Sequence, residues 1–387
     1  MKDRFISRRY WEEAATPMGK VDQQAKQYDD VIDLGLGDPD LTTDLRIIAP
    51  TFEDVKAGHT KYTEFRGDPE LRDEIQRFYQ EDLGLEIKDE EIFVTAGGCI
   101  AMYLALEAIL NNGEEVLVQA PYFTPYKQQI ELAGGVPVML ETFEEDEFQI
   151  KSARVEDLIT PRTRAIIINT PSNPTGACLN ANSLETLAAI AKQHGLIVIA
   201  DDIYGAYSYA EPFVPMLSIK GMRERTITIN SFSKNFTMTG WRIGNIIAPP
   251  QLVKVIQQIN ENLMFTAPSI SQRAAIYALR QRKEVQPPMI AEYKRRTFYS
   301  ASRINKIPNM SVLPPKATFY LFVNIQKTGL TSEQVSGAIL EEAHIVTIPG
   351  NSFGACGEGF IRIACTVSME TLKETFDRLE QVSIFQT

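Results

Sequence analysis

The sequence predicts an α/β protein built on a mostly parallel sheet. Three observations support this prediction. Short runs rich in Ile and Val recur between residues 92 and 248, and stretches with helical periodicity separate them. Several of the runs are apolar throughout, which is typical of strands that are covered on both faces. Strands that alternate with helices form parallel sheets, because each helix returns the chain to the start of the next strand.

Seven strands are expected in this sheet. They are Ile92–Thr95, Glu115–Val118, Val136–Leu140, Ala165–Asn169, Leu196–Ala200, Thr226–Asn230 and Ile243–Ala248. Helices are expected between them, for example at Gly98–Asn111 and Ser183–His194. The second of these has Leu184 and Leu187 on one face, and Gly195 just past its end is a normal C-terminal stop.

The pattern changes after about residue 280. Pro287-Pro288 is expected to break the chain, and a basic helix is expected to follow at about Glu292–Asn305. Further strands are predicted at Thr318–Ile325 and Gly359–Ala364, with helices near Ser332–Ala343 and Met369–Gln381. We therefore expect a large domain at 46–285 and a smaller α+β domain made of 286–387 together with the irregular residues 1–45.

Composition and charge argue against several functional classes. The chain has 387 residues, of which 44% are hydrophobic, and a formal net charge of −11, which argues against a nucleic-acid partner. Four cysteines without a C-x-x-C pair and three scattered histidines predict neither a disulfide scaffold nor a metal site. There is no signal-peptide pattern and no apolar run that could span a bilayer. We expect a soluble cytoplasmic protein with no membrane partner.

Candidate functional residues follow the predicted strands at their carboxyl ends, where ligands bind in open parallel sheets. These residues are Gly97-Gly98, Pro121-Tyr122-Phe123, Asn173, Asp201 with Tyr204, and Ser231 to Lys234.

Lys234 and Asp201 are the two candidates with the clearest chemistry. A buried Lys is costly as an ammonium but is useful when it is deprotonated or forms a Schiff base. Asp201 could stabilise a protonated ring nitrogen, and Tyr204 could donate to an oxygen of the same ligand. The alternatives are a solvated surface lysine and a helix-capping aspartate.

Three further features point to anionic ligands. Arg242 with Ser231 and Ser233 could form a phosphate cup, and Gly97-Gly98 precedes a predicted helix whose N–H groups could face an anion. The glycines match neither a Walker A motif nor G-x-G-x-x-G. A structural ion pair and a tight turn are the alternatives.

Arg362 and Asn173 could contact a substrate. Arg362 interrupts an apolar strand, and an inward guanidinium needs a negative partner, either a substrate carboxylate or an internal acid. Asn173 lies in a turn flanked by prolines, a common use of Asn, but this turn follows a strand into the same region.

Taken together, these motifs resemble the class I aminotransferases among the fold-type-I pyridoxal-phosphate enzymes, along nearly the whole chain. The most specific stretches are Asn173-Pro174-Thr175-Gly176, Asp201-Asp202-Ile203-Tyr204, Ser231-Phe232-Ser233-Lys234 and Met238-Thr239-Gly240-Trp241-Arg242-Ile243-Gly244. The resemblance implies an aspartate-aminotransferase-like fold, in which a mostly parallel seven-stranded sheet lies between helices and a smaller domain completes the structure.

The resemblance also implies the cofactor, pyridoxal 5′-phosphate (PLP), and its contacts. Lys234 would hold PLP as a Schiff base, Asp201 would pair with the pyridinium nitrogen, and Phe123 would stack on the ring. Tyr204 and Asn173 would contact the phenolic oxygen. The phosphate would be held by Gly97, Gly98, Cys99, Ser231 and Arg242. Phe123 stands where Trp or Tyr is common, and Cys99 stands where a hydroxyl is common, so only the backbone N–H of Cys99 is expected to contribute.

Substrate and subunit contacts are implied in the same way. Arg362, helped by the Gly37 backbone and by Asn173, would bind the substrate α-carboxylate. Tyr62 resembles the tyrosine that reaches the cofactor phosphate of the partner subunit, which implies a homodimer with shared active sites. The segment Leu263–Pro268 and Tyr10-Trp11 could line an apolar pocket, so aromatic or broad hydrophobic substrates are as compatible as aspartate.

The implied activity is that of a transaminase. It would move an amino group between an L-amino acid and a 2-oxo acid such as 2-oxoglutarate, by a ping-pong mechanism through aldimines. A PLP-dependent carbon–sulfur β-lyase would use the same residues. A distant alternative is a serine acyl-enzyme of the penicillin-binding type, because Ser231-x-x-Lys234 and Lys327-Thr328-Gly329 match short motifs of that class. A third alternative, the effector domain of a transcription regulator, is disfavoured, since only about 34 residues precede Gly35 and an appended DNA-binding domain needs more.

Overall fold

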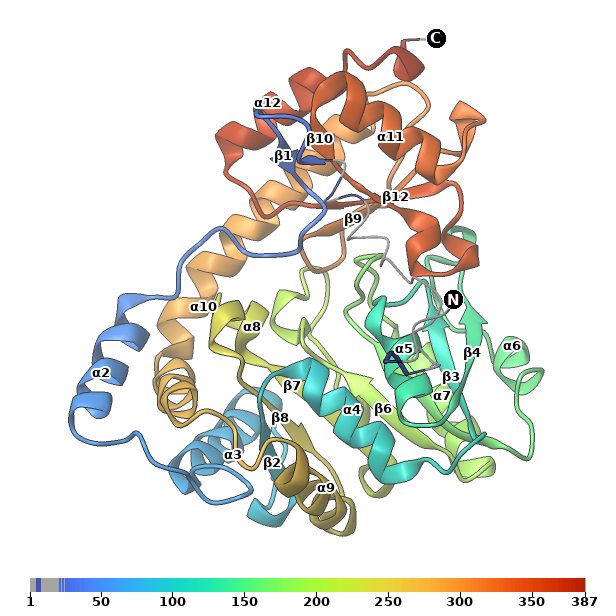
Figure 1. Cartoon of the computed structure of the whole chain (residues 1–387). Helices are drawn as coiled ribbons and strands as arrows, with labels where there is room; N and C mark the ends of the chain where they lie inside the picture. Colours follow the sequence, from blue (N-terminus) through green and yellow to red (C-terminus); the bar gives the residue numbers. More distant parts are fainter. Residues whose placement is uncertain (1–4, 8–20, 22, 24, 387) are drawn as a thin grey trace.

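The protein has a larger and a smaller sheet, which one long helix connects. The structure is a computed structural model, and it describes residues 5–7, 21, 23 and 25–386. In Figure 1 the larger sheet lies in the lower half, the smaller sheet lies above it, and helix α10 (Ser269–Ile304) runs between the two. Within the described residues, no helix is both long and apolar enough to cross a bilayer.

The larger sheet has seven strands in the order β2-β8-β7-β6-β5-β3-β4. Their bounds are β2 Ile92–Thr95, β3 Glu115–Ala120, β4 Val136–Glu141, β5 Thr163–Asn169, β6 Ile197–Asp201, β7 Thr226–Ser231 and β8 Gly244–Ile247. Strands β4, β3, β5, β6 and β7 pair in parallel, whereas β8 runs antiparallel to both of its neighbours. The predicted mostly parallel sheet is confirmed, and each strand lies within about two residues of its expected bounds.

Helices cover both faces of this sheet, and successive residues of a strand therefore pack into different cores. In β3, Val116 and Val118 pack in the core that α4 (Gly98–Ile109) and α9 (Pro250–Leu263) cover, whereas Leu117 packs in the core that includes α7 (Ala181–Gln193). This alternation follows from the two-residue period of a strand. Both faces are apolar, and the strands therefore read as continuous apolar runs.

Three further helices complete the larger part of the fold, together with one turn that carries the expected lysine. They are α3 (Pro69–Leu83), α5 (Pro125–Leu132) and α6 (Ser152–Glu156), and the turn is α8 (Phe232–Asn235). α3 begins with Asp68, whose side chain accepts a hydrogen bond from the Glu70 N–H at 3.0 Å. It ends at Gly84, whose φ of 66° is the left-handed conformation that glycine adopts easily.

The predicted break at Pro287-Pro288 is wrong, because α10 continues through both prolines from Ser269 to Ile304. A proline inside a helix lacks the N–H that would donate a backbone hydrogen bond, but tertiary contacts stabilise α10 on both sides of the two prolines. Its first half packs in a core with α3, and its end packs in the core of the smaller sheet. Buried Arg296 also pairs with Asp40 at 2.6 Å.

The smaller part is α+β, as expected. Its antiparallel sheet has the order β11-β12-β9, and a parallel pair joins β1 to β10. The bounds are β1 Ile32–Asp33, β9 Tyr320–Asn324, β10 Ile345–Val346, β11 Ile348–Pro349, β12 Phe360–Ala364, α11 Ser332–Ala343 and α12 Met369–Leu379. Helix α2 (Leu45–Lys56) follows the N-terminal strand. We retain the division into 46–285 and 1–45 with 286–387 as a proposal; its second boundary falls inside α10.

Candidate active site

A cavity of about 310 Å³ lies at the carboxyl ends of the central strands. Its lining includes eleven of the thirteen expected site residues, namely Gly37, Gly98, Cys99, Phe123, Asn173, Asp201, Tyr204, Ser231, Lys234, Arg242 and Arg362. Gly97 lies directly behind it, because a Cβ added to Gly97 would meet the Arg242 guanidinium at 2.7 Å. Among the expected residues, only Tyr62 lies apart from this group.

Lys234 reaches the cavity from α8, a single turn that follows β7. Its Nζ donates to the Gly37 carbonyl at 2.5 Å, and the Tyr207 hydroxyl donates to the Lys234 carbonyl at 2.9 Å. Burial lowers the pKa of Lys234 to about 8, although the charge of Asp38 opposes the shift. A substantial fraction of this amine is therefore neutral near pH 8, as a nucleophilic lysine requires.

Asp201 ends β6 with its carboxylate buried in the same cavity. The Tyr126 hydroxyl donates to its Oδ2 at 2.5 Å, and the Ile203 N–H donates to its Oδ1 at 3.3 Å. Burial raises the pKa of Asp201 to about 6, and these two hydrogen bonds oppose the shift. A cation placed against this carboxylate would lower its pKa again, because opposite charges favour the ionised form.

A candidate anion site lies where α4 begins. Gly97 precedes α4 with a φ of 90°, and no side chain caps the helix, so its first N–H groups face the cavity. The Ser231 hydroxyl lies 3.0 Å from that of Ser233. Arg242 donates to the Thr239 carbonyl at 2.8 Å, and no carboxylate among the described residues pairs with it. A phosphate fits this set of donors.

Cys99 lies beside this anion site as a neutral thiol. Burial raises the pKa of Cys99, which keeps the proton on sulfur at neutral pH. This agrees with the expectation that the backbone, and not the thiol, serves an anion there.

Arg362 enters the cavity from β12 and is 2% exposed. It donates to Asn173 Oδ1 at 2.9 Å and to the Gly35 carbonyl, and its guanidinium lies 4.7 Å from the Tyr320 ring centroid. Its Nε has no hydrogen-bond partner, and no acid among the described residues pairs with the guanidinium. Since a buried unpaired charge is costly, this arginine is suited to receive a carboxylate from a ligand.

The sequence alone did not identify two tyrosines that contact Asp201 and Tyr204. Tyr126 donates to Asp201, and the Tyr320 hydroxyl lies 3.2 Å from that of Tyr204. Burial raises the pKa of both Tyr204 and Tyr320, so both hydroxyls keep their protons. Tyr126 follows Phe123 in the same strand-end segment, which was a weak signal, whereas no pattern in the sequence linked Tyr320 to Tyr204.

Tyr62 does not line the cavity of its own chain. It is 78% exposed, and its ring centroid lies 4.8 Å from that of Phe265. The Lys327-Thr328-Gly329 motif lies in a turn of the smaller part and does not line the cavity either. The expected Tyr10-Trp11 pocket segment falls outside the described residues.

Comparison with known proteins gives concordant matches. A family model described as aminotransferase class I and II matches residues 29–379. The chain is 36% identical over 380 residues to an aspartate aminotransferase of Pyrococcus horikoshii, covering 97% of both chains. It is 36% identical over 367 residues to aromatic-amino-acid aminotransferase 2 of Thermococcus litoralis, covering 94% of both.

Solved structures match over the same length. The crystal structure of an aromatic aminotransferase from Pyrococcus horikoshii OT3 has a TM-score of 0.89 and 38% identity, covering 94% of this chain and 98% of that one. Aspartate aminotransferase from Thermus thermophilus with maleate has a TM-score of 0.91 and 30% identity, covering 98% and 100%.

Proposed function

The chain belongs to the family of class I and II aminotransferases, and from this premise we propose that Lys234 binds PLP in the cavity described above. The protein is a transaminase. Its relatives favour amino-group transfer over the carbon–sulfur lyase and the serine acyl-enzyme. One observation carries the assignment: a partly buried lysine of lowered pKa, a buried carboxylate and a buried arginine that no acid among the described residues pairs with all line one cavity.

The residues present fit PLP at both of its ends. The uncapped start of α4, the Ser231 hydroxyl and the unpaired Arg242 suit the phosphate, with the backbone of Gly97, Gly98 and Cys99 around it. A side chain at Gly97 would push the Arg242 guanidinium away from this site, since its hypothetical Cβ meets that group at 2.7 Å, and the φ of 90° also favours glycine. Phe123 offers a ring face to the cofactor. When bound, PLP supplies an electron sink for the carbanion formed at the substrate Cα.

Asp201 would hold the proton on the ring nitrogen. Its carboxylate, which Tyr126 fixes in place, is the acceptor that a pyridinium N–H requires. Asn173 accepts from Arg362 with its amide oxygen, which leaves its amide N–H groups to donate to the phenolic oxygen beside Tyr204. Asn173 therefore links the cofactor side of the cavity to the substrate side.

Lys234 would be the residue that moves the proton. Burial lowers the pKa of its amine to about 8 in the protein without cofactor, close to the optimum for general acid–base work at neutral pH. The Gly37 carbonyl, 2.5 Å from Nζ, would keep this amine close to the substrate.

Arg362 would bind the α-carboxylate of both substrates, the amino acid and the 2-oxo acid. A single arginine is sufficient because the two substrates take turns in a ping-pong cycle. We propose aspartate and aromatic L-amino acids as donors and 2-oxoglutarate as an acceptor, from the names of the relatives.

The donor test is a panel of L-amino acids with 2-oxoglutarate, in which the 2-oxo acid product is measured. Aspartate, phenylalanine and tyrosine should be active, and Lys234→Ala should abolish turnover with every donor. Release of pyruvate and ammonia from cystathionine, without amino transfer to 2-oxoglutarate, would contradict the proposal in favour of the lyase.

We propose a homodimer in which Tyr62 reaches the phosphate of the partner subunit's cofactor. Tyr62 belongs to an exposed apolar patch of the kind that marks protein interfaces. The Phe265 ring contacts both Tyr62 and Phe65, and exposed Leu263 and Met264 directly precede Phe265 in the chain. We also propose that the protein is cytoplasmic and has no nucleic-acid or membrane partner; its acidic net charge disfavours nucleic acid.

Mixed dimers test this arrangement. Tyr62→Ala and Lys234→Ala subunits, unfolded together and refolded as a mixture, should form heterodimers with one intact site, so activity should exceed that of either parent. No gain in a mixture that contains heterodimers would contradict a contribution of Tyr62 to the partner's site.

A further inference from the structure

A second cavity, of about 400 Å³, lies behind the helix turn that carries Lys234. The two cavities share a wall: Lys234 lines the first and Asn235 the second, while Ser231 lines both. The same division occurs at the end of β6, where Asp201 lines the first cavity and Asp202 the second. The second cavity belongs to no step proposed above.

Apolar side chains and paired charges form the sides of this cavity. Phe78, Phe213 and Ile290 are among its apolar residues. Near its mouth, Arg282 pairs with Asp82 at 2.8 Å and with Glu81 at 2.7 Å. Lys283 likewise pairs with Glu81, at 2.8 Å. Because these cations are already paired, the cavity does not favour an anion.

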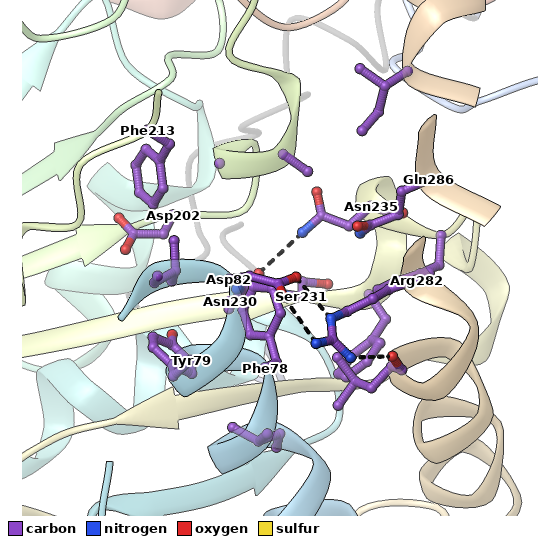
Figure 2. A pocket seen from close by; sticks show the side chains of 18 of the residues that line it. Phe78, Tyr79, Asp82, Asp202, Phe213, Asn230, Ser231, Asn235, Arg282 and Gln286 are labelled. Atoms are coloured by element: carbon purple, nitrogen blue, oxygen red, sulfur yellow. Dashed lines mark hydrogen bonds and ion pairs between the residues drawn. The ribbon is translucent and has the colours of Figure 1, made fainter. Parts of the chain in front are cut away.

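Two buried oxygen atoms in the lining have no hydrogen-bond donor among the described residues. They are Oδ1 of Asp202, a residue 4% exposed, and Oδ1 of Asn235, a residue 7% exposed. Figure 2 shows Asp202 beside Phe213 on one side of the cavity and Asn235 beside Gln286 on the other. Buried acceptors without donors are uncommon and costly in folded proteins.

Asp202 also lacks a compensating charge. Burial raises the pKa of Asp202 well above its usual value, and the neighbouring charge of Asp201 adds to the shift. The unpartnered Nδ2 of Asn245 is a different case, because it lies close to the Tyr79 hydroxyl. Burial raises the pKa of Tyr79, and the Asn245 amide beside it opposes that shift. A positive charge with an N–H donor beside Asp202 would favour its ionised form and satisfy its Oδ1, whereas Asn235 lacks only a neutral donor.

We propose that this second cavity binds a small organic ammonium ion with an apolar body, whose N–H groups donate to Asp202. Its volume lies in the range of small-molecule sites, and its lining combines apolar side chains with polar groups that could orient a ligand. The aromatic rings of Phe78 and Phe213 suit a cation as well as an apolar body. This site is independent of amino transfer, so binding there does not require the reaction proposed above.

The test is isothermal titration of the holoenzyme with N-methylbenzylammonium. This secondary amine has two N–H donors on its cationic nitrogen and cannot form a neutral Schiff base with the cofactor. The first cavity disfavours it in the holoenzyme, because PLP fills part of that cavity and Arg362 has no acid partner there among the described residues. We expect saturable binding of the probe, and binding at least about tenfold weaker for benzyl alcohol, which lacks the charge, and for benzyltrimethylammonium, which lacks the N–H donors.

Variants locate the site. Asp202→Asn should weaken binding of the probe at least about tenfold, whereas Asp157→Asn, which removes an exposed carboxylate elsewhere, should leave it unchanged. Ala206→Leu adds volume to the cavity wall and should also weaken binding, with turnover kept. Ala206→Leu serves as the second variant if Asp202→Asn does not fold.

Three results would overturn the proposal. One is the absence of saturable binding to the wild-type holoenzyme, as expected of a cavity that holds only water. Another is equal affinity for benzyltrimethylammonium, which would show that the acceptor oxygens do not recognise the ligand. The third is unchanged binding in both Asp202→Asn and Ala206→Leu, which would place the probe elsewhere.

Discussion

Arg362→Lys separates recognition of the α-carboxylate from recognition of the side chain. Arg362 is buried, lies between the rings of Tyr320 and Phe353, and donates to Asn173 and to the Gly35 carbonyl. Lysine keeps the positive charge but loses the planar fork that binds a carboxylate through two parallel hydrogen bonds. It would also leave the oxygen atoms of Asn173 and Gly35 with fewer donors.

The loss can be estimated from these contacts. Truncating one partner of a buried, hydrogen-bonded charge pair costs about 2–5 kcal/mol. Since 1.36 kcal/mol corresponds to a factor of ten in rate, kcat/KM should fall about 30-fold to several thousand-fold. Every amino acid has the same α-carboxylate, so we expect the same factor for aspartate, phenylalanine and tyrosine.

The assay is steady-state amino transfer to 2-oxoglutarate with each of the three donors, with cofactor content checked by absorbance. Arg362→Gln is the matched comparison and should lose more activity than Arg362→Lys, since it also removes the charge. A loss confined to aspartate would show that Arg362 binds the side-chain carboxylate instead. An unchanged kcat/KM with all donors would refute its role in substrate binding.

Three other changes give distinct results. Tyr126→Phe removes the hydrogen-bond donor to Asp201, whose ionised form would hold the ring proton. A lost hydrogen bond to a charged group costs about 1.5–3 kcal/mol, so the pKa of Asp201 and the acid limb of the kcat/KM profile should rise by about one pH unit or more. An acid limb that does not move would contradict this. Cys99→Ser should change PLP affinity less than about threefold in equilibrium titration, because we propose that only the backbone of Cys99 contacts the phosphate. A tenfold change would implicate the thiol. Pro288→Ala restores an N–H donor inside α10 and should raise the free energy of unfolding by about 1 kcal/mol in urea titration, whereas lower stability would show that the proline fits the helix without cost.

The sequence predicted the strands of the larger sheet well for a physical reason. Strands such as β5 and β6 are buried on both faces, so they are nearly continuous runs of Ile, Val and Ala whose ends are visible in the sequence. The expected site residues follow these strands, and the shared edge of a parallel sheet brings them together.

The prediction failed where packing outweighed local preference. Pro287-Pro288 is a strong local signal for a helix end, but the contacts of α10 with both cores and the Arg296–Asp40 ion pair come from residues far apart in the sequence. The same limit explains Tyr126 and Tyr320. Their partners lie 75 and 116 residues away, respectively, so no local pattern showed the hydrogen bonds to Asp201 and Tyr204.

The second cavity shows another limit of sequence reasoning. Asp202 follows Asp201 directly, and the motif shows two adjacent acids without showing that they face different cavities. Only the extended backbone at the end of β6, which turns successive side chains to opposite faces, assigns one acid to each cavity.

The central claim is that one amine, that of Lys234, carries the cofactor. The most direct measurement is borohydride reduction of the protein with bound PLP, followed by proteolysis and mass spectrometry of the peptides. The predicted result is a single reduced pyridoxyl group on the peptide with Lys234, and none in Lys234→Ala. A label on another lysine, or no label on a protein saturated with PLP, would contradict the assignment.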